Sequence, residues 1–299
     1  MQTTKGHIAV FAAGLIFGVN YWIAKELMLS FTPFQVVFIR IFFATCIFWV
    51  CGFWVKQNQK ISKKDLLRIF IAGVLGITVN QAMFFAGLNY SSPVETSIIQ
   101  TLVPILVAVF AAFLIKEKIS LKQKTGILLG FAATIIIVTH GKQVSFYDFS
   151  FVGNILLIIN IIAYSLFLIL IKPIMAKYHF ISVLKFVFLA GFISYLPVGI
   201  IVVQDMSIIG LPLNVWLSLG YVVIAATFIS YFLKMYALKT LTATTVGFYT
   251  YLQPFIASMI GLISGKEILT IKQLIATLVL CFGVFLVITS NNNFKNDQK

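Results

Sequence analysis

Apolar segments long enough to cross a membrane alternate with short polar connections along the whole chain. A transmembrane α-helix needs about 20 consecutive, mostly apolar residues. Ten segments meet this requirement, at about residues 7–28, 34–55, 66–87, 92–115, 121–140, 150–171, 181–203, 213–238, 243–264 and 270–290. The pattern therefore predicts an all-α integral membrane protein with ten transmembrane helices and no room for an extramembrane domain.

The second half of the chain repeats the first at an offset of 150 residues, so that Asn80–His140 falls on Ser230–Ser290 without a gap. The aligned pairs are Pro104 and Pro254, Lys116–Glu117 and Lys266–Glu267, and Lys122–Gln123 and Lys272–Gln273. Because a repeat determines the architecture, we predict two five-helix units, residues 1–140 and 150–290. Five is an odd number, so the second unit has to be inverted in the membrane. Inverted repeats of this kind build transporters whose binding site lies near the membrane midplane.

The composition excludes a water-soluble domain. Hydrophobic residues make up 61% of the chain and charged residues 10%, whereas soluble domains average about 25% charged residues. The net charge of +14 does not indicate a nucleic-acid partner, because the basic residues are scattered between apolar segments as the positive-inside rule distributes them. The cysteines Cys46, Cys51 and Cys281 lie in apolar segments and form no disulfide framework. Membrane lipid is therefore the expected partner of the surface.

The basic residues also predict the orientation. With the N-terminus in the cytoplasm, 17 of the 22 Lys and Arg residues lie on the cytoplasmic side, which is the asymmetry typical of membrane proteins. The first apolar run, from Ile8 to about Ala24, is long for the apolar region of a signal peptide, so we interpret it as a transmembrane helix. We expect a protein integral to the cytoplasmic (inner) membrane of a prokaryote, with both termini cytoplasmic.

Several motifs together resemble one transporter family. They are Phe17-Gly-Val-Asn20, Phe38-Ile-Arg40, Gly87-Leu-Asn-Tyr-Ser-Ser with Pro104 and Lys116-Glu117, and in the second half Tyr236-Ala-Leu-Lys, Thr250-Tyr-Leu-Gln-Pro254 and Gly265-Lys-Glu267. This set is similar to the EamA-type transporters of the drug/metabolite transporter superfamily. The resemblance implies ten helices in two inverted five-helix halves, and the export or exchange of small metabolites. The chain departs from the pattern at Lys116, where a glycine is common, and at Lys234, where an aromatic residue is common.

The fourth and ninth predicted helices carry the best candidate binding face. Ser97, Gln100, Thr101 and Pro104 are spaced i, i+3, i+4 and i+7, so they share one helix face. The repeat places Gly247, Thr250, Tyr251 and Pro254 at the equivalent positions. Polar side chains that face lipid are costly, so we expect this face to line a cavity. Packing between helices, for which Ser, Thr and Gln are also used, is the alternative.

Further polar residues at membrane depth complete the candidate substrate-binding set. They are Asn20, Asn80, Gln81, Tyr164, Tyr231 and Tyr249. Each of them could instead be a packing residue. Gln81 and Tyr231 occupy equivalent positions of the two repeats, which favours both as substrate-binding residues.

The charged residues inside the predicted helices allow two interpretations each. Arg40 is expected to pair with a carboxylate, with a substrate-carboxylate anchor as the alternative, because a charge at that depth is costly. Glu95 fits a capping box but is also a candidate for proton coupling. Lys234 is expected to extend its ammonium group to the cytoplasmic interface. Glu117 and Glu267 are expected to stabilise helix-to-helix turns, with lysines or helix-opening amides as partners.

These features favour a secondary transporter of small organic metabolites that works by alternating access. The chain has no P-loop, no HExxH motif and no His or Cys cluster with metal-ligand spacing, so we expect no enzyme activity, no cofactor and no metal. One alternative is a lipid-linked or amphipathic cargo, favoured by the 30 phenylalanines. The other is a membrane-embedded enzyme or sensor.

Overall fold

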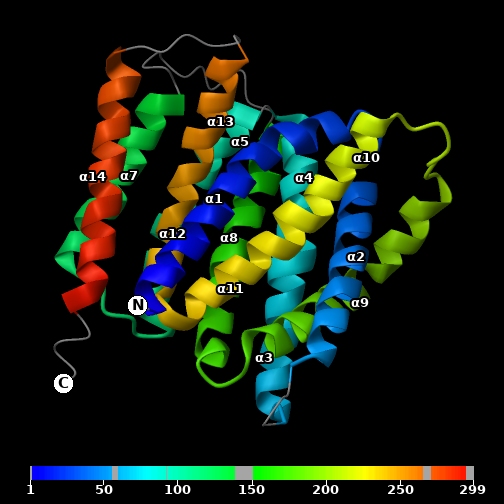
Figure 1. Cartoon of the computed structure of the whole chain (residues 1–299), viewed down its shortest axis with the longest axis horizontal. Coiled ribbons are helices and arrows are strands. Elements are labelled where there is room, and N and C mark those ends of the chain that lie inside the picture. The colour runs from blue at the N-terminus through cyan, green and yellow to red at the C-terminus, as the bar shows by residue number, and fades with distance from the viewer. Residues whose placement is uncertain (1, 56–59, 92, 139–150, 265–270, 294–299) are drawn as a thin grey trace.

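A computed structural model describes residues 2–55, 60–91, 93–138, 151–264 and 271–293. Within these ranges the chain is a bundle of helices with no β-strand (Figure 1). The first half holds α1 (Gln2–Leu27), α2 (Pro33–Phe53), α3 (Lys63–Gly73), the π-helix η1 (Val74–Val79), α4 (Asn80–Tyr90), α5 (Pro93–Gln100), α6 (Val103–Leu114) and α7 (Leu121–Val138). The second half holds α8 (Phe151–Met175), α9 (Phe180–Gln204), α10 (Leu213–Gly220), the π-helix η3 (Tyr221–Ile229), α11 (Ser230–Thr240), α12 (Ala243–Phe248), the short 3₁₀ helix η4 (Tyr249–Tyr251), α13 (Leu252–Ile263) and α14 (Ile271–Asn293).

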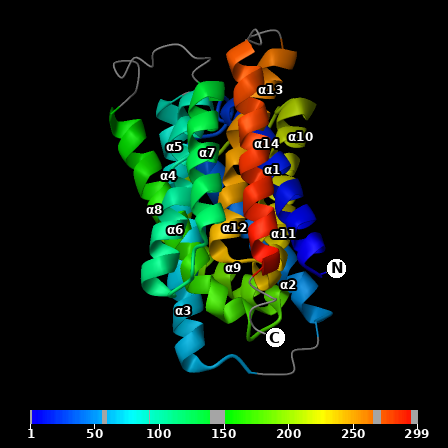
Figure 2. The same cartoon turned by 90° about the vertical axis from the view of Figure 1, so that its left-hand side faces the viewer.

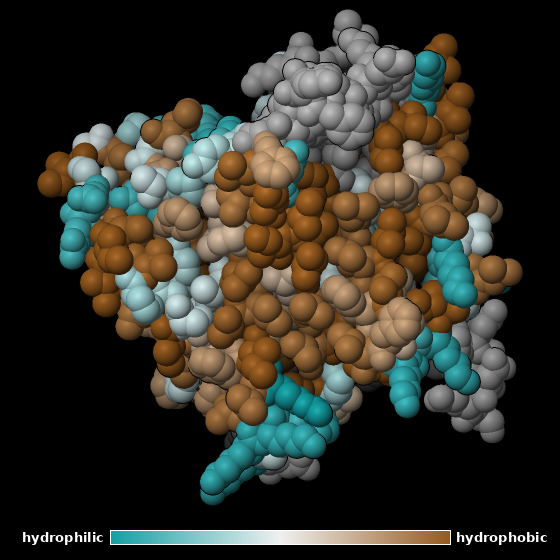
Figure 3. All heavy atoms as spheres, turned by 180° about the vertical axis from the view of Figure 1, so that it is seen from behind, coloured by the Kyte–Doolittle hydropathy of each residue, from teal (hydrophilic) through white to brown (hydrophobic). Residues whose placement is uncertain are grey.

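Seven helical stretches of the described chain are long and apolar enough to span a membrane. They are Thr3–Leu27, Pro33–Phe53, Lys63–Tyr90, Phe151–Met175, Phe180–Gln204, Leu213–Thr240 and Ala243–Ile263. The other three predicted segments coincide with α5–α6, α7 and α14. A hydrophobic surface runs across the middle of the molecule, while polar side chains gather toward its edges (Figure 3). The prediction of an all-α integral membrane protein is therefore confirmed.

Breaks in the helices recur at the repeat offset. The π-helical turns of η1 and η3 end immediately before Asn80 and Ser230, which are equivalent positions. Farther along, Pro104 and Pro254 lack the N–H that would bond to the carbonyl groups of Gln100 and Thr250, and a proline ring clashes with that carbonyl in a regular helix. The chain accordingly leaves the regular α-helix between α5 and α6 and again in η4. Both halves thus carry irregular backbone within their central helices.

Two lysines donate hydrogen bonds to the carbonyl groups at equivalent helix C-termini. Lys25 Nζ donates to the carbonyl oxygens of Leu88 and Ser91, each at 2.9 Å. Lys172 Nζ donates to those of Leu238 and Leu241, at 2.6 and 2.5 Å, which lie 150 residues after the first pair. The last carbonyl groups of a helix lack partners within the helix and attract cations. The two contacts therefore close the ends of α4 and α11 in the same way.

Glu117 connects the two halves of the chain. Its carboxylate accepts hydrogen bonds from the backbone N–H groups of Ala243 and Thr244, both at 3.2 Å. N–H groups at the start of a helix such as α12 have no acceptor within the helix, and the helix dipole there favours an anion. Helix-opening amides were one of the expected partners, but they belong to the other half rather than to the next helix. Glu267 lies outside the described residues.

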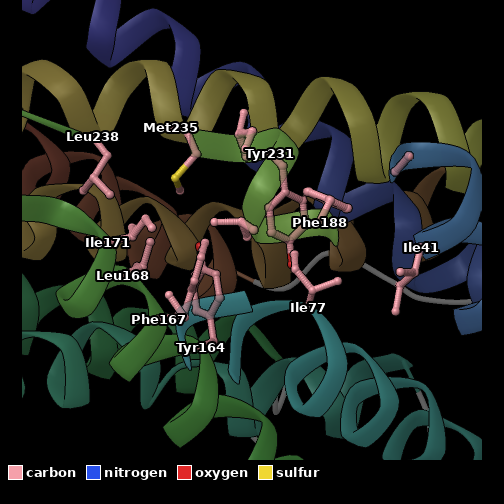
Figure 4. Packing of buried hydrophobic residues seen from close by; sticks show 14 of the residues in the cluster. Ile41, Ile77, Tyr164, Phe167, Leu168, Ile171, Phe188, Tyr231, Met235 and Leu238 are labelled. Atoms are coloured by element: carbon pink, nitrogen blue, oxygen red, sulfur yellow. The ribbon is translucent and has the colours of Figure 1, made fainter. Parts of the chain in front are cut away.

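Helices α7 and α14 lie side by side along one edge of the bundle (Figures 1 and 2). Close packing there requires glycine, because a Cβ atom on Gly126 would lie 2.9 Å from the carbonyl oxygen of Gly283. The start of α1 and the end of α14 lie toward the same end of the molecule (Figure 2). The main hydrophobic core lies between the other helices, and its aromatic side chains pack around Tyr231 (Figure 4).

Candidate functional site

A small polar cavity lies at the centre of the bundle, with a volume of about 40 Å³. Its lining residues are Phe17, Arg40, Asn80, Gln81, Phe84, Gln100, Asn160, Tyr164, Tyr231, Lys234, Thr250 and Gln253. They come from both halves of the chain. One water molecule needs roughly 10–15 Å³ of such volume, so the cavity holds a few waters at most. An organic molecule can enter only if the surrounding helices move apart.

The side-chain amides of Gln100 and Asn160 and the backbone carbonyl group of Asn80 form a hydrogen-bonded group on one side of the cavity. Gln100 Nε2 donates to Asn160 Oδ1 at 2.6 Å, and Asn160 Nδ2 donates to the carbonyl oxygen of Asn80 at 2.7 Å. These residues belong to α5, α8 and α4. Gln100 and Asn160 are buried, where a polar group needs a partner to offset its desolvation. Asn160 therefore holds the three helices together at the cavity wall.

Tyr231 lines the cavity, and its ring packs against that of Phe188 (Figure 4). Its hydroxyl donates to the carbonyl oxygen of Gly76 at 2.9 Å and accepts a long hydrogen bond from Gln81 Nε2 at 3.4 Å. Gly76 belongs to the π-helix η1, and Tyr231 is the second residue of α11, which follows the π-helix η3. Single π-helical turns occur frequently at functional sites. Gln81 and Tyr231 are equivalent residues of the two repeats, so the repeats meet at this contact.

Several buried polar atoms have no hydrogen-bond partner among the described residues. Tyr164 Oη and Gln81 Oε1 belong to cavity-lining residues, and neither side-chain polar atom of Asn20 is paired. An unpaired buried polar atom costs about 1–3 kcal/mol. Water or a bound solute in the cavity would supply the missing partners for Tyr164 and Gln81.

Arg40 reaches the cavity from α2 and is only 2% exposed. Its Nε donates to Thr227 Oγ1 at 2.9 Å, and its guanidinium lies over the ring of Phe85, 4.9 Å from the centroid. Thr227 is positioned by η3, where its hydroxyl donates to the Val222 carbonyl oxygen five residues earlier. The expected carboxylate partner is not found among the described side chains. Glu26 is exposed, and the side chain of Glu95 lies outside the described set.

Lys234 also lines the cavity. The prediction that its ammonium group extends to the cytoplasmic interface is therefore wrong. The residue is 6% exposed, and its Nζ lies 3.7 Å from the centroid of the Phe17 ring and 4.9 Å from that of Tyr164. A desolvated cation–π contact contributes about 2 kcal/mol, less than the several kcal/mol that burial of an ion costs. The aromatic rings therefore hold the side chain inward without fully compensating its charge.

The cavity brings together six of the predicted site residues: Asn80, Gln81, Gln100, Tyr164, Tyr231 and Thr250. The other five are buried but do not line it: Asn20, Ser97, Thr101, Tyr249 and Tyr251. The hydroxyl of Tyr249 bonds His7 Nδ1 at 2.9 Å, and that of Tyr251 donates to the Ile127 carbonyl oxygen at 3.1 Å on α7. The i, i+3, i+4 spacing places residues on one face only in a continuous α-helix. Here the helices break next to Thr101 and at Tyr249–Tyr251.

Besides Arg40 and Lys234, two uncharged polar residues of the cavity lie outside the predicted set. Asn160 is one of two asparagines in the apolar run 150–171, and a polar residue at membrane depth is a functional candidate by default. Gln253 directly precedes Pro254, and its Oε1 accepts a hydrogen bond from the Tyr21 hydroxyl at 3.1 Å. Among the described residues no group of His, Cys, Asp and Glu is arranged to hold a metal ion.

Comparisons with known proteins agree with the fold and the repeat. The model of the EamA-like transporter family matches residues 4–139 and again 151–289. The uncharacterized transporter YyaM of Bacillus subtilis is 22% identical over 95% of this chain and 93% of its own length. The uncharacterized inner membrane transporter YedA of Escherichia coli is 24% identical over 93% of this chain and 89% of its own. A crystal structure with 16% sequence identity superposes with a TM-score of 0.75 and covers 97% of this chain and 99% of its own. Because the family model covers most of the sequence, the chain belongs to the EamA-like transporter family.

Proposed function

We propose that the protein is a secondary transporter that moves small organic metabolites by alternating access. The observation that carries the proposal is the buried polar cavity whose lining comes from both halves, with Gln81 and Tyr231 in contact. A site of this kind between two repeats is the arrangement expected of a transporter built from inverted halves. The name of each relative described above also identifies it as a transporter.

The proposed architecture is two inverted five-helix repeats, residues 1–140 and 150–290. Two observations support the inversion. The helix pair α5–α6 runs from the upper end of the bundle downward, whereas its equivalent, α12–α13, runs upward (Figure 2). The ends of α4 and α11 that lysines close at equivalent carbonyl groups lie at opposite ends of the bundle (Figure 1). Rocking of one repeat against the other would open the closed cavity to one side of the membrane at a time.

Counterflow in proteoliposomes tests the transport proposal. The full chain is reconstituted into liposomes loaded with one unlabelled metabolite, and uptake of the same radiolabelled compound is measured over a panel of amino acids, organic acids and sugars. We expect transient accumulation of at least one compound, absent from protein-free liposomes.

Collapse of an imposed pH gradient would slow net flux if protons are coupled, with Glu95 as the candidate carrier. Turnover of a compound without exchange of any would instead indicate an enzyme.

A second candidate cargo is an amphipathic or lipid-linked molecule. One observation favours it: an apolar groove of about 420 Å³ between α1, α9 and α11, lined by Ala9, Phe180, Phe232 and Tyr236 among others. Lys5 lies at this groove and could contact a polar headgroup. The same liposomes distinguish the candidates, because movement of a labelled lipid between leaflets without metabolite exchange would favour the second.

We expect both termini in the cytoplasm of a prokaryotic cell and the Lys266–Glu267 turn outside it. The distribution of basic residues motivates this orientation, and the ends of α1 and α14 lie toward one end of the bundle. Single cysteines at Lys142, Lys266 and Asn296 in a cysteine-free background are treated with an impermeant thiol reagent on intact cells. Labelling of the first two positions alone is the expected result. Labelling of Asn296 alone would reverse the orientation.

A further inference from the structure

The central cavity contains two cationic side chains that no described carboxylate neutralises. Arg40 and Lys234 both line it. Two like charges in a desolvated site oppose each other more strongly than they would in water. A buried cation needs a counter-charge or a full set of hydrogen bonds. The described lining of the cavity provides no negative charge to balance these two cations.

The described carboxylates are all engaged or placed elsewhere. Asp65 bonds Lys177 and Tyr178, and Glu117 binds the start of α12. Glu26 and Asp205 are exposed. None of these four carboxylates contacts either cation of the cavity. The charge that balances Arg40 and Lys234 is therefore not supplied by this described set.

The free donors in the cavity suit an anionic group. Arg40 uses Nε for Thr227, and no hydrogen bond joins either of its Nη atoms to a described residue. A guanidinium with both Nη groups free binds a carboxylate or phosphate through two parallel hydrogen bonds. Lys234 Nζ makes ring contacts but no hydrogen bond within the described chain, and the Tyr164 hydroxyl is unpaired. These three groups form a donor-rich pocket that contains no described carboxylate.

We propose that the transported substrate carries a carboxylate or phosphate group, which binds between Arg40 and Lys234. This inference rests on the proposed transport function and specifies its substrate class. A cationic drug would add a third positive charge to the site, and a zwitterion would place its ammonium group beside two cations. Binding of a small organic anion neutralises the site and supplies the missing hydrogen-bond acceptors.

Thermal unfolding of the purified full chain in a neutral detergent tests the binding. The probes are succinate, glycerol 3-phosphate, glutamine, the tetraphenylphosphonium cation and phosphatidylglycerol. Ligands that bind only the folded state raise the unfolding temperature. We expect at least one of the two soluble anions to do so, and the glutamine zwitterion and the cation not to. A response to phosphatidylglycerol alone would assign the site to a lipid headgroup and overturn the proposal, as would no response to either soluble anion.

Variants separate the anion site from general stability. Arg40→Met and Lys234→Met are each expected to weaken anion binding about 10- to 150-fold, which is the effect of removing a charge-assisted hydrogen bond. Lys234→Arg keeps the positive charge and is expected to retain part of the anion affinity. Without ligand, Lys234→Met is expected to unfold at the same or a higher temperature, because it removes an uncompensated buried charge. The matched control is Lys185→Met, since Lys185 also lies over aromatic rings, Trp49 and Phe186, but outside the cavity. Unchanged anion binding in both cavity variants would overturn the proposal.

Counterflow of the same compounds distinguishes the two proposals. Exchange of neutral or cationic compounds only would leave the transport function standing and overturn the anion site. Anion binding that Arg40→Met and Lys234→Met remove, without exchange of any compound, would establish the site and overturn transport. Exchange of an anion that depends on Arg40 and Lys234 supports both.

Discussion

Replacement of Gly76 by valine is expected to abolish transport and to lower the stability of the folded protein by about 1–3 kcal/mol. A Cβ atom at this position would lie 2.3 Å from two atoms of the Phe167 ring. Phe167 is fully buried and packs against Tyr164 and Tyr231, with centroid distances of 6.3 Å to each. Because the ring is buried against these two tyrosines of the cavity wall, we expect the substitution to displace them together with it.

Thermal unfolding in detergent and counterflow in proteoliposomes measure the two effects. Gly220→Val is the matched control, because Gly220 precedes the equivalent π-helix and a Cβ atom there meets nothing within 4 Å. We expect this control to retain transport. Equal unfolding temperatures and equal transport rates for the two variants would show that the close contact at Gly76 does not determine the cavity.

Replacement of Asn160 by alanine is expected to reduce transport more than stability. The change leaves Gln100 Nε2 and the Asn80 carbonyl oxygen without their partner. An unsatisfied buried group costs about 1–3 kcal/mol, but single hydrogen bonds between membrane helices average only about 0.6 kcal/mol, and cavity water can replace part of the loss. We therefore expect the substitution to lower the stability of the folded protein by about 1–3 kcal/mol in total. If the substrate contacts the amide group, its affinity falls about 5- to 150-fold in addition.

Asn154→Ala on the same helix is the matched control, since its side-chain oxygen has no partner among the described residues. A double-mutant cycle with Gln100→Ala measures the coupling of the two amides. The combined loss should be smaller than the sum of the single losses, because either substitution breaks the same hydrogen bond. Additive losses would mean that Gln100 and Asn160 act independently and that their 2.6 Å contact contributes little.

The membrane location, the helix positions and the repeat follow from the order of residues along the chain. Backbone polar groups have no water to bond in lipid, so a spanning segment becomes a helix wherever the hydrophobic run is long enough. Hydropathy is a local property and can be read without the fold. The repeat offset can also be read from the sequence alone, and it identifies as equivalent residues Gln81 and Tyr231, which are in contact at 3.4 Å.

Which polar groups meet at the centre depends on contacts between helices that are far apart in the sequence. The helix breaks next to Thr101 and at Tyr249–Tyr251 change the direction of the side chains, so a helical spacing could not predict that Tyr251 bonds α7 while Gln100 and Thr250 line the cavity. The surroundings of Arg40 and Lys234 depend on partners far away in the chain, such as Thr227 and Phe17. Burial and charge compensation arise from contacts between helices, and no local pattern of residues contains them.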